Sequence, residues 1–68
     1  MIKFKLKGEY IELNKLLKYL SLCESGGEAK HVISEGLVKV NGEVETRIRK
    51  KLRKEDKVNY KDNEILIV

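Results

Sequence analysis

The chain has 68 residues and a formal net charge of +4, from 15 lysines and arginines against 11 acidic residues. A chain of this length buries only about 60% of its unfolded surface, so we expect one domain over residues 1–68 without room for a deep catalytic cavity. One cysteine and one histidine exclude an internal disulfide and a zinc site made of these ligands alone, and no apolar stretch approaches the roughly 20 residues that cross a bilayer.

The first segment alternates in polarity. Three apolar residues alternate with three lysines from Ile2 to Lys7, which is the two-residue period of a half-buried strand. We interpret these lysines as protection of an edge strand against aggregation rather than as a binding site. The alternation also differs from the continuous apolar centre of a signal peptide, so we expect a cytoplasmic protein. A short chain that starts at Met1 also favours a free-standing module.

A first helix is expected over Glu12–Leu22. Its leucines share one face: Leu13, Leu16, Leu17 and Leu20. Lys15 and Lys18 fall together on the opposite face, where they form either a cationic contact surface or an ordinary solvated face.

A second helix is expected from Gly26 to Glu35. Ser25 and Glu28 have the spacing of a capping box, in which the serine oxygen accepts a helix amide and the glutamate reaches back to the serine amide. Gly36 then supplies a left-handed stop. The amides of Gly26 and Gly27 lie at the positive end of the helix, where an anion is favoured.

A hairpin is expected next, with strands over Leu37–Val40 and Glu43–Glu45. Asn41-Gly42 is the strongest short hairpin signal, because both turn residues need positive φ. Six cations without an acid follow between Arg47 and Lys54, in a segment that we interpret as a loop or an edge.

Two closing strands, Lys57–Tyr60 and Glu64–Val68, surround a turn at residues 61–63. The order strand-helix-helix-strand-strand-strand-strand predicts an α+β domain, with two packed helices followed by a small, mostly antiparallel sheet. We expect the second helix, the hairpin and the cationic segment to form one electropositive platform, for which folded RNA is the leading ligand.

Together these motifs resemble the S-four-type RNA-binding domain, named after a small-subunit ribosomal protein, and its small free-standing members in particular. The residues that carry the resemblance are Leu13, Leu16, Leu17, Ser25–Lys30, Ile33, Glu35, Gly36, Val38–Gly42, Lys51, Leu52 and Asp56–Val58. The resemblance implies an alpha-L RNA-binding motif that binds structured RNA, often ribosomal or transfer RNA, through the two helices and the hairpin. Many members have arginine where this chain has Glu12 and Gly26, and a proline-glycine turn where it has Lys54-Glu55. We expect Arg47–Lys51 to take over part of the work of those arginines.

The candidate RNA-binding residues combine the resemblance with the cationic segment. They are Lys15, Lys18, Ser25, Gly26, Gly27, Lys30, Lys39, Asn41, Arg47, Arg49, Lys50 and Lys51. Arg47 and Arg49 are the candidates for forked phosphate contacts, and Asn41 for a base edge or a ribose hydroxyl, unless it serves the turn alone. Scarce aromatic residues favour recognition of RNA shape and backbone over stacking on single strands.

We therefore predict a non-catalytic, ribosome-associated protein whose partner is structured RNA, such as ribosomal RNA or ribosomal particles. We expect no catalytic residue, no bound metal or cofactor, no association with a membrane and no small-molecule substrate. The alternative is a protein-interaction module that docks on a ribosomal protein or an RNA-processing enzyme through its terminal strands. An enzyme has weaker support, because no nucleophile is paired with a base.

Overall fold

A computed structural model describes all of residues 1–68. Its elements, in chain order, are β1 (Ile2–Phe4), β2 (Ile11–Glu12), α1 (Leu13–Tyr19), α2 (Gly26–Ser34), β3 (Val38–Val40), β4 (Glu43–Val44), β5 (Lys51–Leu52), β6 (Lys57–Tyr60) and β7 (Asn63–Ile67).

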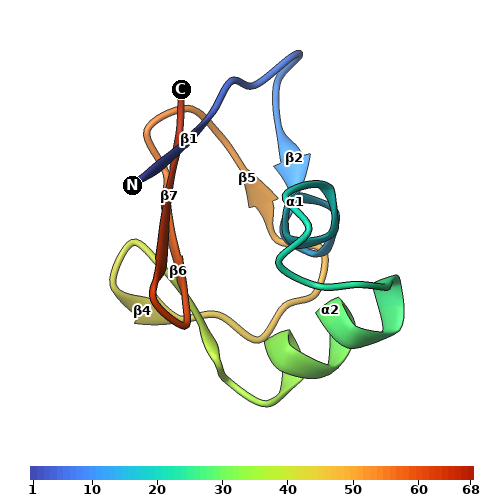
Figure 1. The fold of residues 1–68 in the computed structure, drawn as a ribbon. Coiled ribbons are helices and arrows are strands. Elements are labelled where there is room, and N and C mark those ends of the chain that lie inside the picture. Colours follow the sequence, from blue (N-terminus) through green and yellow to red (C-terminus); the bar gives the residue numbers. More distant parts are fainter.

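The main sheet has five strands in the order β1-β7-β6-β3-β4. Every neighbouring pair is antiparallel except β1 and β7, which run parallel. The sheet lies on one side of the molecule and both helices lie on the other, with the chain after β4 closing the space between them (Figure 1). The prediction of an α+β domain with a mostly antiparallel sheet is confirmed.

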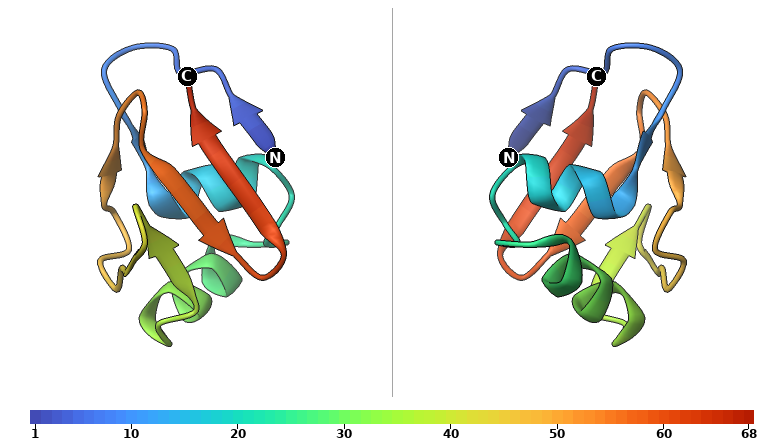
Figure 2. Two further views of the ribbon diagram at one scale, coloured as in Figure 1. Left: turned by 90° about the vertical axis from the view of Figure 1, so that its left-hand side faces the viewer. Right: turned by 90° about the vertical axis from the view of Figure 1, so that its right-hand side faces the viewer.

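The two-residue period of the strands decides which side chains are buried. One face of the sheet contributes Val38, Val40, Val58, Tyr60, Ile65 and Ile67 to a single cluster of 15 buried residues. The alternate residues Lys39 and Lys57 are exposed on the face turned away from the helices. In Figure 2, the left view looks onto this open face of the sheet, and the right view looks onto the helices. The helices add three leucines of α1 and Ala29, Val32 and Ile33 of α2. Leu6, Cys23 and Leu52 complete the cluster.

The first helix is shorter than predicted, because it begins at Leu13 and ends at Tyr19 rather than Leu22. Ser21 adopts a left-handed φ of 60°, and the amides of Leu22 and Cys23 both donate to the carbonyl of Leu17. This tight ending turns Cys23 into the core, where it is buried. The second helix ends one residue before the prediction, with Gly36 at a φ of 76° as expected.

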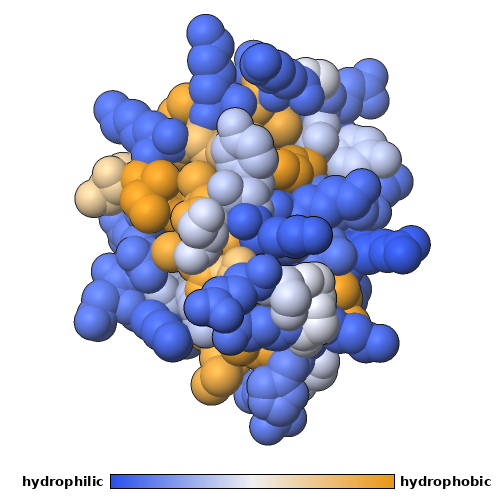
Figure 3. Space-filling model, turned by 45° about the vertical axis from the view of Figure 1, so that its right-hand side comes forward, coloured by the Kyte–Doolittle hydropathy of each residue, from blue (hydrophilic) through white to orange (hydrophobic).

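A second, two-stranded sheet was not predicted. β2 pairs antiparallel with β5, so Ile11 lies opposite Leu52 and Glu12 opposite Lys51. Of the two alternatives for the cationic segment, a loop or an edge, residues Lys51–Leu52 form an edge strand, in which Leu52 is fully buried. Hydrophilic side chains cover much of the surface in Figure 3, and apolar side chains gather toward one side of the face it shows.

Candidate nucleic-acid interface

The cationic segment, defined here as Arg47–Arg53, is fixed to the start of α1. The residue before α1, Glu12, provides no side-chain cap, so the first helix amides need other acceptors. Leu13 N donates to Lys50 O at 2.9 Å, and Asn14 N donates to Ile48 O at 3.1 Å. Together with the pairing of β2 and β5, these bonds hold the backbone that carries the cations in one position.

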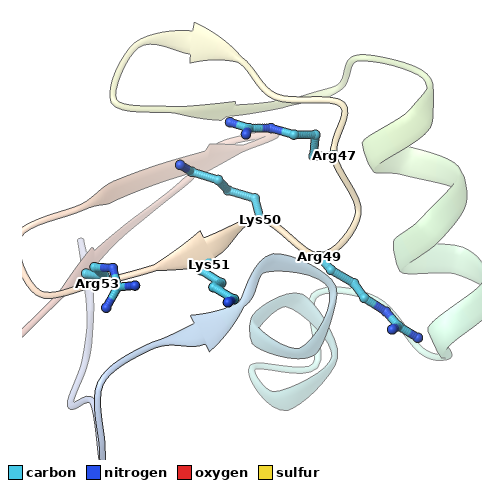
Figure 4. Close-up of a pocket in the computed structure, with 5 residues that line it drawn as sticks. All are labelled: Arg47, Arg49, Lys50, Lys51 and Arg53. Carbon is cyan, nitrogen blue, oxygen red and sulfur yellow. The ribbon is translucent and has the colours of Figure 1, made fainter.

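Five side chains of this segment line one open hollow of about 500 Å³, which we call the basic hollow: Arg47, Arg49, Lys50, Lys51 and Arg53. No acidic or apolar residue contributes to the lining. Figure 4 shows that Arg47 and Lys50 extend toward the β3–β4 hairpin, whereas Arg49 extends toward the helices. The segment therefore reaches both of the elements that we expected it to join.

A second groove of about 360 Å³ lies where α2 begins, and we call it the helix-start groove. It is lined by Asn14, Gly26, Lys30, Ile48 and Arg49. The amides of Gly26 and Gly27 make no hydrogen bond within the protein, which leaves two donors free at the positive end of α2. The side-chain oxygen of Asn14 is buried without a partner, and no motif in the sequence had indicated this residue.

A third groove, of about 260 Å³, runs along the hairpin. Its lining includes Asn41 and Glu45 together with Arg47 and Lys50 of the cationic segment. Arg49 thus belongs to both the basic hollow and the helix-start groove, and Arg47 and Lys50 belong to both the basic hollow and the hairpin groove. The three elements expected to form a platform are joined through the cationic segment.

Five candidate residues line none of these grooves. Two of them, Ser25 and Gly27, flank Gly26 at the start of α2, and the other three lie elsewhere. Lys39 points from the open face of the sheet and lines a separate hollow with Asn59 and Lys61. Lys15 is exposed and forms an ion pair with Glu12, Nζ to Oε1 at 3.4 Å. Lys18 is exposed in the last turn of α1 and lines none of the grooves. Conversely, Arg53 lines the basic hollow although it was not among the candidates; its period-two spacing from Lys51 was the available signal.

Arg47 is already engaged within the protein. Its Nε and Nη2 donate to the two carboxylate oxygens of Glu45 at 2.9 and 3.0 Å, and its amide donates to Glu45 Oε2 at 3.0 Å. These hydrogen bonds hold the pKa of Glu45 below its ordinary value, and they raise the pKa of Arg47 above the ordinary value of an arginine. The fork of Arg47 is thus occupied by an acid, whereas Arg49 has no acidic partner.

Asn41 and Gly42 adopt φ of 52° and 86°, as the hairpin prediction requires. The Asn41 side chain also makes contacts inside the protein, because its Nδ2 donates to Asp56 Oδ1 at 2.9 Å and its Oδ1 accepts from Lys57 N at 2.9 Å. One donor hydrogen of the amide remains for a ligand.

The cap of α2 is partly as predicted. Ser25 Oγ accepts a hydrogen bond from Glu28 N at 3.1 Å. The return bond is different, because Glu28 Oε1 accepts from the amide of Glu24 rather than from that of Ser25. The Ser25 amide is therefore not used by the cap, and the predicted reciprocal pair is wrong in that half.

No group of three or more histidine, cysteine, aspartate or glutamate residues is placed to hold a metal ion. Burial raises the pKa of the Cys23 thiol, which disfavours the reactive thiolate. None of the helices is both long enough and apolar enough to span a membrane.

Comparison with known proteins identifies this class of small α+β domain. The sequence profile of the S4 domain matches residues 4–68, and the chain therefore belongs to the S4 domain family, the S-four type of the sequence resemblance. YbcJ of Escherichia coli (strain K12), which is named as a candidate RNA-binding protein, is 42% identical over 62 residues, covering 91% of this chain and 89% of YbcJ. A Shigella flexneri protein that is also called YbcJ, and that has no assigned function, matches with the same identity and the same coverage.

The fold is also that of a solved relative. The solution structure of YbcJ from E. coli, described as containing an alpha-L motif involved in RNA binding, superposes with a TM-score of 0.75 and covers 100% of this chain and 87% of YbcJ.

Proposed function

We propose that this protein is a non-catalytic RNA-binding domain that spans residues 1–68 and recognises structured RNA through the basic hollow and the helix-start groove. The observation that carries the proposal is the position of Arg49, which lines both spaces and so connects five cationic side chains to the free amides at the start of α2. Membership of the S4 domain family and the description of YbcJ support the same ligand.

The charges of the platform favour a polyanion. The two spaces contain six cationic residues, of which only Arg47 has an acidic partner: Lys30, Arg47, Arg49, Lys50, Lys51 and Arg53. Each phosphate that such a residue neutralises releases condensed counterions and strengthens binding at low salt. The platform therefore suits the phosphate backbone of a folded RNA.

The same linings support binding without catalysis. They hold no carboxylate, thiol, hydroxyl or imidazole, which are the usual nucleophiles and general acids or bases. We propose ribosomal RNA or ribosomal particles as the partner, because the sequence resembles a domain named after a ribosomal protein. This partner places the protein in the cytoplasm.

The proposal is tested by RNA binding as a function of salt. Fragments of ribosomal RNA are titrated with the wild type, with Arg49→Ala/Lys50→Ala/Lys51→Ala, and with the matched triple variant Lys3→Ala/Lys54→Ala/Lys57→Ala, whose lysines line neither space. We expect the first triple variant to weaken binding and to reduce the slope of log K against log salt by about 2, while the second leaves most of the slope. Absence of binding by the wild type at low salt, or equal losses in both variants, would contradict the proposal.

A further inference from the structure

An apolar hollow lies beside the basic one and has no assigned role. It has a volume of about 320 Å³ and is lined by Phe4, Lys5, Leu6, Lys7, Tyr10, Ile11 and Tyr19. These residues come from the end of β1, the chain that follows it, β2 and the end of α1. We call it the aromatic hollow, because it gathers two of the three tyrosines and the single phenylalanine of the chain.

The rings of this hollow are available to a ligand. Tyr19 is 72% exposed and Tyr10 is 41% exposed. Phe4 and Tyr19 stand edge to face, with centroids 5.3 Å apart, so the phenylalanine supports the exposed tyrosine. Exposed aromatic surface that is gathered in a hollow is typical of a binding site rather than of a solvated surface.

Tyr10 connects the aromatic hollow to the basic hollow. Lys51 Nζ lies 4.9 Å from the centroid of the Tyr10 ring, and Arg53 Cζ lies 5.8 Å from it. Both cations also line the basic hollow. The pairing of β2 with β5 explains this contact, because Ile11 lies opposite Leu52 and the next residue of each segment, Tyr10 and Arg53, follows directly beyond that pair. Two further cations, Lys5 and Lys7, line the aromatic hollow itself.

We propose that the aromatic hollow binds one unpaired nucleobase of the RNA, stacked against Tyr10, while its flanking phosphates contact Lys51 and Arg53 on one side and Lys5 and Lys7 on the other. The inference rests on the proposed function and adds to it a contact with a single-stranded nucleotide. A base offers a flat apolar face with a phosphate on either side, and the hollow offers aromatic rings together with two pairs of cations. An aromatic side chain of a protein partner would match the rings but would leave four cations without anions.

The contact is tested first on the wild type. A pool of RNA hairpins with randomised loops containing 4-thiouridine is bound at low salt and irradiated, and the modified peptides are identified by mass spectrometry. We expect uridine adducts on Tyr10 or Tyr19. Adducts confined to the cationic segment and to the start of α2 would overturn the base site but leave the proposed function intact, whereas retention of no RNA would overturn both.

Variants separate stacking from charge. Tyr10→Leu removes the ring, Tyr10→Phe keeps it, and Leu37→Ala shortens another exposed apolar side chain, which lies outside the hollow. We expect Tyr10→Leu to weaken binding of the looped hairpins by about tenfold or more, with no loss for a fully paired RNA duplex, and Tyr10→Phe and Leu37→Ala to bind both RNAs like the wild type. Equal losses on the looped and paired RNAs, or no loss on either, would overturn the proposal. Circular dichroism of each variant checks that the fold is retained.

Discussion

The side chain of Asn41 donates a hydrogen bond from Nδ2 to Oδ1 of Asp56, 2.9 Å away and 15 positions later in the chain. The other oxygen of Asp56 accepts from the amide of Arg53 at 2.8 Å. The tip of the β3–β4 hairpin is thus joined to the last residue of the cationic segment through one carboxylate. The hairpin and the cations of the proposed interface are positioned relative to each other by this pair.

Substitution of Asn41 should therefore reduce stability. Two variants separate the contribution of its side-chain hydrogen bonds from that of its left-handed backbone. Asn41→Gly removes the side-chain hydrogen bonds but tolerates the φ of 52°, so we expect a loss of about 1–2 kcal/mol in the free energy of unfolding. Asn41→Ala removes the same bonds and also strains the left-handed backbone, which should cost about 1 kcal/mol more. Urea unfolding followed by circular dichroism measures both values. A glycine variant as stable as the wild type would show that the bonds to Asp56 and Lys57 contribute nothing.

The contacts of Asn41 also separate what the sequence predicts from what only the fold determines. The turn at Asn41-Gly42 was predictable, because positive φ at asparagine and glycine is a local preference. The partner of the Asn41 side chain was not, because it depends on the fold that brings Asp56 to the hairpin. The S4-type fold was recognisable because its motifs are short and local, such as the serine cap of α2 and the left-handed Gly36.

The cationic segment illustrates the same limit. Its charge was evident, but two residues do not display a strand period, so the pairing of Leu52 with Ile11 had no local signature. The early end of α1 has a similar cause, since the left-handed residue is Ser21, which is not a usual stop. The ion pair of Arg47 with Glu45 was not predicted either, because a run of cations does not indicate which of them turns back to an acid two residues earlier.

Release of Arg47 from Glu45 should strengthen RNA binding. Glu45→Gln removes the charge that occupies the arginine fork, so Arg47 can contact a phosphate, and we expect severalfold tighter binding with a slope against salt steeper by about 0.9. Glu43→Gln is the matched control, because Glu43 lines the same groove but has no ion pair. Salt titrations of both variants with the same ribosomal RNA fragment make the comparison. Equal gains would mean that only the change in net charge matters.

The same ion pair should make stability depend on pH in the acid range. Because the pKa of Glu45 is lower in the folded protein than its ordinary value of 4.5, the folded state favours the ionised carboxylate. This contribution is present above the ordinary value and is lost as the pH falls through the folded pKa. We expect the wild type to be more stable than Glu45→Gln at neutral pH and the difference to shrink as the pH falls below about 5. Urea unfolding of both proteins across this range measures the difference, which a constant offset would contradict.

The cap of α2 allows its role in folding to be separated from its proposed role in RNA binding. Ser25→Ala removes the acceptor for the amide of Glu28 and should cost about 1 kcal/mol of stability. Ser25→Asn and Ser25→Asp both keep a capping oxygen, and only aspartate places a negative charge beside the free amides of Gly26 and Gly27. We expect the asparagine variant to keep the RNA affinity and the aspartate variant to lose it severalfold, because a carboxylate there competes with a phosphate. Thermal unfolding and RNA titration of the three variants test both parts. If aspartate and asparagine bind RNA equally well, the start of α2 does not hold a phosphate and its glycines serve the fold alone.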